Sequence, residues 1–431
     1  MRFTELTPEQ RVGAVLDAGS FEPWGGAGAL LLGRGTIDAR TVYVVTTAPG
    51  VARGAIGVHE CQGLSALLSH ARDARGPIVL LLDSSGARVD EGLPALGAFR
   101  MLLREALLTR LAGAPMLAVV GRGCFGGASL LACVCGGRLY LVGARLAASG
   151  PAVIEGAMGA AHFDARNPAE VDALMGSAAR VAIDDRGTLV ADTPEAVRES
   201  VRGWLDASLD PWEPQVEHAL QRDRLSVAGA MPLPATISST LAARFAAILP
   251  RGYEPHVAAH AFCALPPAKS DSAAFLGTLS GAPVGAATCW QIADWLLAIR
   301  RDYPNSAVVL LLDADGHAAS VADERVLLSA YLVHLALTLA WLRATGHRVV
   351  LWIPGRASGA SYVTFAAPVD AVSALPSAQI EILPAAAVKQ IVKGRAGIPA
   401  DPSTYLEAGV AEAFLDHQLA GYADPARPHY E

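Results

Sequence analysis

The chain has 431 residues, of which 52% are hydrophobic, 17% are charged and 6% are aromatic, and its formal net charge is −7. This length corresponds to two or three domains, and the acidic balance argues against a nucleic-acid partner, which would need a basic face. The six cysteines include no Cys-x-x-Cys pair, so neither a disulfide framework nor a zinc ribbon is expected.

The predicted elements follow the same order in both halves of the chain. The first half gives a strand at Ile78–Leu82, the loop SSGARVDEG, a helix over 93–111, a strand over 114–120 and the loop GRGCFGGAS. The second half gives a strand at Val308–Leu312, the loop DADGHAAS, a helix over 325–346, a strand over 347–354 and the loop GRASGAS. The spacing also recurs, since Asp83 and Gly127 are 44 positions apart and Asp313 and Gly359 are 46 apart.

Self-similarity on this scale predicts a duplicated α/β fold. The two strands are apolar throughout, which is typical of a sheet covered by helices on both faces. We divide the chain into domains 1–212 and 256–431, joined by a connector at 213–255. The boundary is placed where Pro211, Pro214, Pro232 and Pro234 interrupt the apolar periodicity.

The ends of the chain and its most apolar segment bear on localisation. The opening MRFTELTPEQ lacks the apolar core of a signal peptide, so we expect a cytoplasmic protein. The segment Val326–Leu342 has seventeen residues without a formal charge, but it contains Ser329, Tyr331 and His334. A spanning helix needs about 20 apolar residues. We therefore predict a buried helix and no membrane partner.

The glycine loop GRGCFG, at 121–126, matches the G-x-G-x-x-G pattern of dinucleotide-binding folds. That pattern expects an acidic residue about 20 positions later, yet no Asp or Glu occurs between Gly127 and Ile154. The loop GRASGAS in the second half also departs from the pattern. We therefore disfavour a dinucleotide site.

Both glycine loops suit a different chemistry, in which backbone N–H groups stabilise a developing negative charge. Glycine permits close approach of a ligand oxygen, and a helix N-terminus adds partial positive charge. The predicted oxyanion-hole residues are Ser85 and Gly86 with Gly126 and Gly127 in the first half, and Asp315 and Gly316 with Gly359 and Ala360 in the second. The alternative is that each loop is a plain glycine turn that lets a helix pack tightly.

Several segments together resemble a known family. SSGARVDEG, GRGCFGGAS, SGPAVIEGAMG and HFDARNPAEVDALMG are similar to the β subunit of biotin-independent malonate decarboxylase. VGAATCWQIADWLLAI, LLDADGH, GHRVVLWIPGRASGAS and ALPSAQIEILPAAAV resemble its γ subunit. The resemblance implies a β–γ fusion with two tandem crotonase-like carboxyltransferase domains of the ββα-superhelix type. His317 stands where the resemblance leads us to expect Gln.

The resemblance also implies the activity. In that family the β and γ parts decarboxylate a malonyl thioester to an acetyl thioester, without biotin and without a metal. The thioester is carried on the dephospho-CoA-derived arm of an acyl carrier protein, and a separate, alpha-type transferase subunit exchanges acetyl for malonate within an oligomer. Carrier protein and free CoA both stay open as substrates here. The alternatives are a biotin-dependent acyl-CoA carboxyltransferase component and a non-catalytic scaffold of the same fold.

Loss of CO2 leaves an enolate, whose charge the amides of the first loop would hold, while the second loop would face the carboxylate. The predicted substrate-binding residues are Cys124, Phe125, Arg88, His317, Arg356 and Ser361. The candidate donors of a proton to the enolate carbon are Cys124, His59, Ser361 and Tyr362, with water as an equal competitor, and each side chain also has a purely structural interpretation. Arg88 either binds a phosphate-bearing arm or pairs internally with Glu91.

Overall fold

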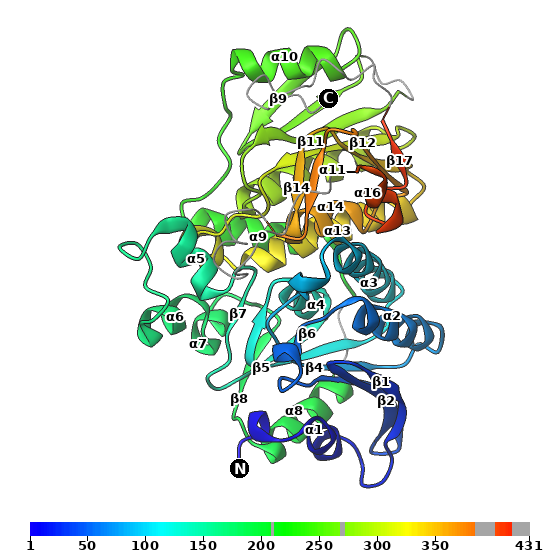
Figure 1. The fold of residues 1–431 in the computed structure, drawn as a ribbon, viewed down its shortest axis with the longest axis vertical. Helices are drawn as coiled ribbons and strands as arrows, with labels where there is room; N and C mark the ends of the chain where they lie inside the picture. The colour runs from blue at the N-terminus through cyan, green and yellow to red at the C-terminus, as the bar shows by residue number, and fades with distance from the viewer. Residues whose placement is uncertain (208–210, 268–271, 384–400, 416–431) are drawn as a thin grey trace.

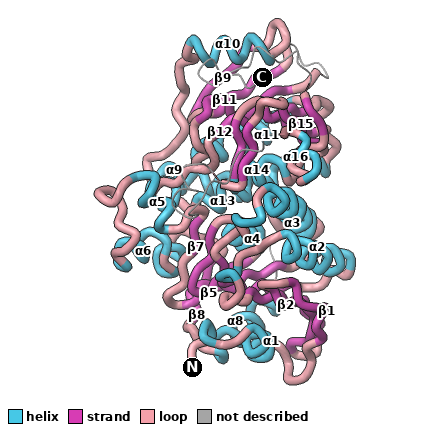
Figure 2. The backbone as a smooth tube through the Cα atoms, in the orientation of Figure 1, coloured by secondary structure: helices cyan, strands magenta, loops and turns pink. Residues whose placement is uncertain are grey.

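The computed structural model describes residues 1–207, 211–267, 272–383 and 401–415. Two α/β units lie one above the other, with the N-terminal unit in the lower part of Figure 1 and the C-terminal unit in the upper part. Figure 2 shows helices gathered in the region between the two sets of strands. The junction of the units is therefore built mainly from helices.

The N-terminal sheet has the order β1-β2-β3-β4-β5-β6-β8, and β7 pairs with β5 beside this path. Its strands are β1 (Glu22–Ala27), β2 (Leu30–Ile37), β3 (Arg40–Thr47), β4 (Ile78–Ser84), β5 (Met116–Phe125), β6 (Gly137–Leu141), β7 (Leu146–Ala147) and β8 (Gly187–Val190). The C-terminal sheet has the order β17-β15-β13-β12-β11-β10-β9. Its strands are β9 (Glu254–Ala258), β10 (Ala261–Leu265), β11 (Ala274–Gly281), β12 (Val308–Ala314), β13 (Val349–Ile353), β15 (Ala371–Ala374) and β17 (Ala413–Phe414). The strands β14 (Arg356–Ser358) and β16 (Gln379–Glu381) form a separate pair.

The two sheets repeat each other strand for strand. In each, the first three strands along the chain pair antiparallel, and the strands from the third onward pair parallel. Every residue of the central strands β4 and β12 is buried, as expected for an apolar run between two helical layers. The duplicated α/β fold predicted from the repeat is confirmed.

The helices of the N-terminal unit are η1 (Phe3–Glu5), α1 (Pro8–Val15), η2 (Ala52–Gly54), α2 (Val58–Asp73), η3 (Val89–Glu91), α3 (Leu93–Leu111), α4 (Gly127–Val134), α5 (Pro151–Met158), α6 (Pro168–Met175), α7 (Ser177–Val181) and α8 (Pro194–Asp206). The predicted connector carries α9 (Pro214–Val227) and α10 (Ser239–Ile248). The C-terminal unit adds α11 (Ala286–Asp302), α12 (Val321–Arg325), α13 (Leu328–Ala344), α14 (Gly359–Ala366) and α16 (Ser403–Glu407).

The predicted helix over 325–346 is interrupted near its start. Leu327 adopts a left-handed conformation, with φ of 67°, and separates α12 from α13. α13 is then buried around most of its circumference, including the polar side chains of Ser329 and His334. Among the described residues, no helix is long and apolar enough to cross a membrane.

The units are joined by close contacts between α3 and α4 on one side and the C-terminal unit on the other. The hydroxyls of Ser129 in α4 and Ser329 in α13 are 2.8 Å apart. Arg100 in α3 is buried, and it donates to the carbonyl oxygens of Ala366 (3.0 Å) and Gly409 (3.1 Å). These buried polar contacts fix how one unit sits on the other.

Candidate active site

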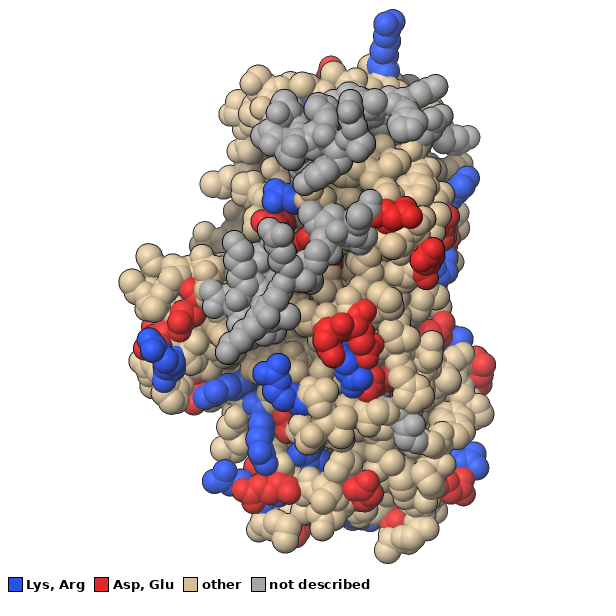
Figure 3. Space-filling view, in the orientation of Figure 1, with Lys and Arg blue, Asp and Glu red and all other residues tan. Residues whose placement is uncertain are grey.

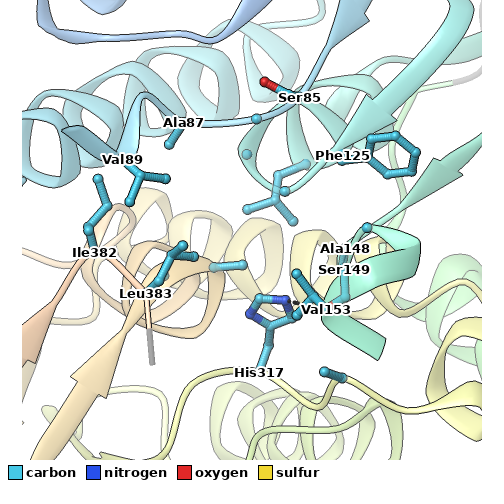
Figure 4. A pocket seen from close by; sticks show the side chains of 18 of the residues that line it. Ser85, Ala87, Val89, Phe125, Ala148, Ser149, Val153, His317, Ile382 and Leu383 are labelled. Atoms are coloured by element: carbon cyan, nitrogen blue, oxygen red, sulfur yellow. Dashed lines mark hydrogen bonds between the residues drawn. The ribbon is translucent and has the colours of Figure 1, made fainter. Parts of the chain in front are cut away.

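A cavity of about 770 Å³ lies between the two units and is lined by residues from both. The N-terminal unit contributes Ser85, Gly86, Ala87, Arg88, Phe125, Gly126, Gly127 and Ser149, and the C-terminal unit contributes Asp315, His317, Gly359, Ala360, Ile382 and Leu383. Figure 4 shows the His317 side chain on the opposite side of the cavity from Ala87 and Ser85. The cavity thus brings both predicted loop pairs to one space.

The loops that follow β4 and β12 have the same backbone geometry. Ile56 forms an isolated parallel bridge with Ala87, and Val284 forms one with His317. The Ile56 carbonyl oxygen accepts from the backbone N–H of Arg88, and the Ile56 N–H donates to the Gly86 carbonyl oxygen (both 2.9 Å). In a parallel bridge, the residue that lies between the two bonded residues points its own N–H away from the bridge partner. Ala87 and His317 therefore turn their N–H groups away from these bridges, and neither has an acceptor among the described residues.

Four of the predicted donor groups are occupied, three of them in the first half of the chain. The N–H of Ser85 donates to the Arg53 carbonyl (3.1 Å), that of Gly86 to Ser84 Oγ (3.1 Å) and that of Gly126 to the Ala147 carbonyl (3.2 Å). In the second loop, the Asp315 N–H donates to the Gly281 carbonyl (3.2 Å). These glycines shape the loops, but the N–H groups of Ser85, Gly86, Gly126 and Asp315 are not the free donors that we predicted.

The free donor of the first glycine loop lies one residue further along. Gly127 is the first residue of α4 and lines the cavity, and its N–H has no acceptor in the described part of the chain, as is general for the first turn of a helix. Gly127 is one of the donors that the sequence predicted, and Ala87 takes the place predicted for Ser85 and Gly86. In the second loop, Gly359 and Ala360 open α14 at the cavity wall, and Gly316 lies one residue before His317.

Glycine is required at two points of the first site. Gly86 has φ of 104°, and a Cβ there would lie 3.0 Å from the Phe125 carbonyl oxygen, so the two loops touch through main-chain atoms. Gly127 has no room for a side chain, because an added Cβ would lie 2.4 Å from Cζ of Phe99. Both positions therefore combine a close approach with the placement of the donors.

In each unit, an aspartate at the end of the central strand accepts a hydrogen bond from the backbone of the glycine loop. Asp83 Oδ1 accepts from the Gly123 N–H (3.3 Å), and Asp313 Oδ1 accepts from the Arg356 N–H (2.7 Å). Each aspartate also pairs with an arginine from a helix that precedes its sheet, Arg11 in α1 (3.5 Å) and Arg244 in α10 (3.3 Å). The internal repeat thus extends to the buried charges that support the site.

Of the predicted substrate-binding residues, Phe125, Arg88 and His317 line the cavity. Arg88 bonds Glu60 (2.6 Å) and Glu91 (3.0 Å), so the internal ion pair considered for it is present. Ser361 is buried and donates to the Ser358 carbonyl (2.8 Å) away from the cavity.

Cys124 and Arg356 also lie outside the cavity lining. The Cys124 side chain is packed in the core, and burial raises its pKa well above the usual value of a thiol. Arg356 turns to Asp315, with Nη1 3.4 Å from Oδ2. The shared sequence motifs did not predict which of these side chains reach the cavity, because successive side chains of an extended segment point to opposite sides.

The remaining proton-donor candidates are also placed elsewhere. The Tyr362 hydroxyl is buried and donates to the Val410 carbonyl (2.7 Å), and His59 is exposed on α2 outside the cavity lining. Arg122, the counterpart of Arg356, donates to the Thr4 carbonyl (2.7 Å). The structure brings none of these side chains to the cavity.

A buried polar network beside the cavity was not predicted. Ser149 Oγ lies 3.0 Å from Nε2 of His317, and the Ser149 N–H donates to Oε1 of Glu324 (2.9 Å). Burial raises the pKa of Glu324 to about 7, although the Arg180 guanidinium beside it acts in the opposite direction. Burial lowers the pKa of His317 below its usual value, against the opposing effects of the Ala148 carbonyl and Asp323.

The repeat itself holds a signal for one of the missed residues. The offset that aligns Asp83 with Asp313 also aligns Ala87 with His317. Ser149 and Glu324 belong to no repeated motif, and they meet only because α12 packs near the start of α5.

The rest of the cavity wall is largely apolar, with side chains that include Val89, Phe99, Leu130, Val153, Val363 and Leu383.

Charged side chains of both signs are interspersed over the molecular face in Figure 3. In the described ranges, no group of three or more His, Cys, Asp or Glu side chains could hold a metal ion. The arrangement can therefore offer main-chain donors and one imidazole to a small anion in an apolar setting.

Comparison with protein families matches each unit separately. Residues 10–218 match the model of the carboxyl transferase domain, and residues 280–396 match that of the malonate decarboxylase gamma subunit. The two α/β units thus have the carboxyltransferase, crotonase-like fold that the sequence predicted.

Curated relatives match parts of the chain. A putative propionyl-CoA carboxylase beta chain of Bacillus subtilis is 35% identical over 100 residues, 23% of this chain and 19% of that protein. A malonyl-S-ACP:biotin-protein carboxyltransferase of Malonomonas rubra is 24% identical over 247 residues, 49% of this chain and 77% of that protein. The chain spans only about a fifth to a third of the length of the first five relatives that it matches.

Among solved structures, a Pseudomonas malonate decarboxylase hetero-tetramer in complex with malonate is similar to this chain. It is 27% identical, with a TM-score of 0.48, and the match covers 52% of this chain and 91% of that one. A transcarboxylase 12S structure covers 99% of this chain and 92% of its own, at 19% identity and a TM-score of 0.41.

Proposed function

Because the chain combines a carboxyl transferase domain with a malonate decarboxylase gamma-subunit segment, we propose that it decarboxylates a malonyl thioester to the acetyl thioester and CO2. The observation that carries this proposal is the single cavity onto which Ala87 and Gly127 of one unit and His317 and Gly359 of the other converge. A decarboxylation needs donors at the thioester oxygen and a place for the carboxylate, and the two loops offer both.

The chemistry follows from where charge develops. The bond between the α-carbon and the carboxylate carbon breaks, CO2 leaves, and the electron pair forms an enolate with its charge on the thioester oxygen. The free N–H groups of Ala87 and Gly127 would bind that oxygen more strongly in the transition state than in the substrate. Each such donor contributes about 10²- to 10³-fold in rate in other enzymes.

The second loop and the apolar wall would act on the leaving carboxylate. Gly359 and Ala360, at the start of α14, face it from the C-terminal unit. Apolar side chains such as Phe99 and Val363 replace water around it, which removes the hydration that stabilises the ionised group before CO2 leaves.

The acyl group would arrive on a carrier. The cavity volume of about 770 Å³ exceeds the needs of a malonyl group and falls in the range of pockets for larger ligands. We infer that the remaining space takes the end of a pantetheine-type arm, belonging either to an acyl carrier protein or to CoA. We also propose an alpha-type transferase as a further partner, and we propose that the assembly works in the cytoplasm without bound biotin or metal.

A biotin-dependent carboxyltransferase is the second candidate, because the similarity to the Malonomonas rubra carboxyltransferase covers 77% of that protein. One assay separates the candidates. The purified full chain receives malonyl-CoA or malonyl-loaded carrier protein, and acetyl thioester and CO2 are measured with and without added biotin.

Turnover without biotin supports the decarboxylase. Turnover that requires biotin supports the carboxyltransferase. Absence of turnover with every carrier, with and without biotin, overturns both and leaves a binding scaffold.

A further inference from the structure

His317 is placed unlike any other ionisable side chain of the site. It follows β12, lines the cavity and stands where the first unit has Ala87, which has no ionisable group. Its Nδ1 atom is shielded from solvent and has no hydrogen-bond partner among the described residues. A buried polar atom without a partner is uncommon and points to a ligand that supplies one.

The other ring nitrogen is held in place. Nε2 lies 3.0 Å from Ser149 Oγ, and the Ser149 backbone is fixed by its N–H bond to Glu324 (2.9 Å). Arg180 in turn pairs with Glu324 (3.1 Å), and neither side chain is exposed. A histidine anchored through one nitrogen presents the other in a defined direction. Figure 4 shows the ring pointing into the cavity with Ser149 on one side.

The free nitrogen lies beside the second loop. A Cβ added at Gly359 would be 3.9 Å from Nδ1 of His317, so the imidazole and the N-terminus of α14 border the same part of the cavity. That is the part assigned above to the malonyl carboxylate, and the α-carbon that loses CO2 must lie next to it.

We propose that His317 is the catalytic acid that protonates the enolate carbon after CO2 has left. This assignment rests on the proposed function. In the step, the Nδ1–H bond of the imidazolium breaks and a C–H bond forms at the α-carbon, while the enolate electrons supply the new bond. The neutral imidazole keeps its Nε2–H on Ser149 Oγ, and solvent returns one proton per turnover, the one proton that decarboxylation to an acetyl group consumes.

The four side chains predicted from the sequence for this step all lie outside the cavity lining: Cys124, His59, Ser361 and Tyr362. Of the titratable side chains that do line it, Arg53 and Arg88 hold their protons too tightly to give them up. Asp90 is exposed to solvent, and Asp315 pairs with Arg356, with Oδ2 3.4 Å from Nη1. His317 is the lining group in the described part of the chain whose proton affinity suits the transfer.

The test uses the reverse of the protonation step. An acid that protonates the α-carbon must also, as a base, remove a proton from the acetyl product. The purified full chain is incubated with acetyl-CoA in D2O, and deuterium entering the acetyl methyl group is followed by mass spectrometry, next to CO2 release from malonyl-CoA. We expect exchange with the native chain and an at least 100-fold loss in H317N, which keeps an amide near Nδ1 but transfers no proton.

A chemical rescue separates proton transfer from a structural role. Imidazole added to H317A should restore part of the exchange and of the CO2 release, and pyrazole, which has the same shape but is far less basic, should not. H59N, at an exposed histidine outside the cavity, serves as the matched control and should keep both rates.

The outcomes are distinguishable. If H317N exchanges and turns over like the native chain, or if pyrazole rescues H317A as well as imidazole does, the assignment of His317 is wrong and the decarboxylase proposal stands. If the native chain releases no CO2 from malonyl-CoA or a malonyl-loaded carrier, the proposed function itself fails.

Discussion

Nη2 of Arg180 lies 3.1 Å from Oε2 of Glu324, and both side chains are completely shielded from solvent. Arg180 belongs to α7 of the N-terminal unit and Glu324 to α12 of the C-terminal unit. The same glutamate accepts from the Ser149 N–H, so this ion pair joins the two units directly beside His317.

Removing the charge of Glu324 should destabilise the protein strongly. Above the Glu324 pKa of about 7, where the carboxylate is ionised, E324Q leaves the guanidinium of Arg180 buried without its counter-charge, and breaking such a pair costs about 3–5 kcal/mol. The free energy of unfolding from urea titration measures the effect. E199Q, at an exposed position on α8, should change the stability by less than about 0.5 kcal/mol. Equal losses in the two variants would contradict the role given to the pair.

Stability at low pH should depend on Asp184. Burial acts to raise its pKa, but the Arg138 guanidinium, 2.5 Å away, and the Tyr140 hydroxyl outweigh burial and bring the pKa to about 2. A folded-state pKa below the ordinary 3.8 gives stability that is complete above that value and is lost as pH falls through about 2.

The expected contribution of this shift is about 2 kcal/mol. Unfolding free energies measured between pH 5 and pH 2 should therefore fall more steeply for the native chain than for D184N. Parallel slopes would show that Asp184 is not held as described.

The Gly127 N–H should contribute to catalysis as a hydrogen-bond donor, separately from the close packing of residue 127 against its neighbours. Any side chain at 127 meets Phe99, so the comparison is made in an F99A background. F99A/G127A keeps the amide donor, and F99A/G127P removes it. CO2 release from malonyl-CoA should fall about 10²- to 10³-fold further in the proline variant. Similar rates in both variants would mean that this amide does not hold the enolate oxygen.

Arg88 should act mainly on stability. Its guanidinium bonds Glu91 and Glu60, and the Glu60 side chain is fully buried. R88Q should therefore lower the free energy of unfolding by about 3 kcal/mol, with little change in KM for malonyl-CoA, because two of its nitrogens are already engaged. A large rise in KM without loss of stability would favour the phosphate clamp instead.

The sequence predicted those elements that depend on apolar patterning. The runs at Ile78–Leu82 and Val308–Leu312 became the central strands, and the helix over 93–111 coincides with α3. The two strands are buried along their whole length and α3 buries most of its residues, so the apolar pattern of these segments suffices to predict them.

The donors could not be assigned to single residues from the sequence. Glycine marks a loop that needs an unusual backbone, and Gly86 and Gly126 do have positive φ. Which N–H is free depends instead on the alternating bonds of the bridge at Ala87 and on the start of α4 at Gly127, and neither N–H has an acceptor in the described ranges. The contact between Ser149 and His317 spans 168 positions and arises only when the units dock.

Since one polypeptide supplies both walls of the cavity, their encounter is intramolecular. The connector, which carries α9 and α10, keeps each wall at a high effective concentration relative to the other. Dilution that would separate two independent subunits leaves this site assembled, and synthesis of a single chain fixes the ratio of its two parts at one to one.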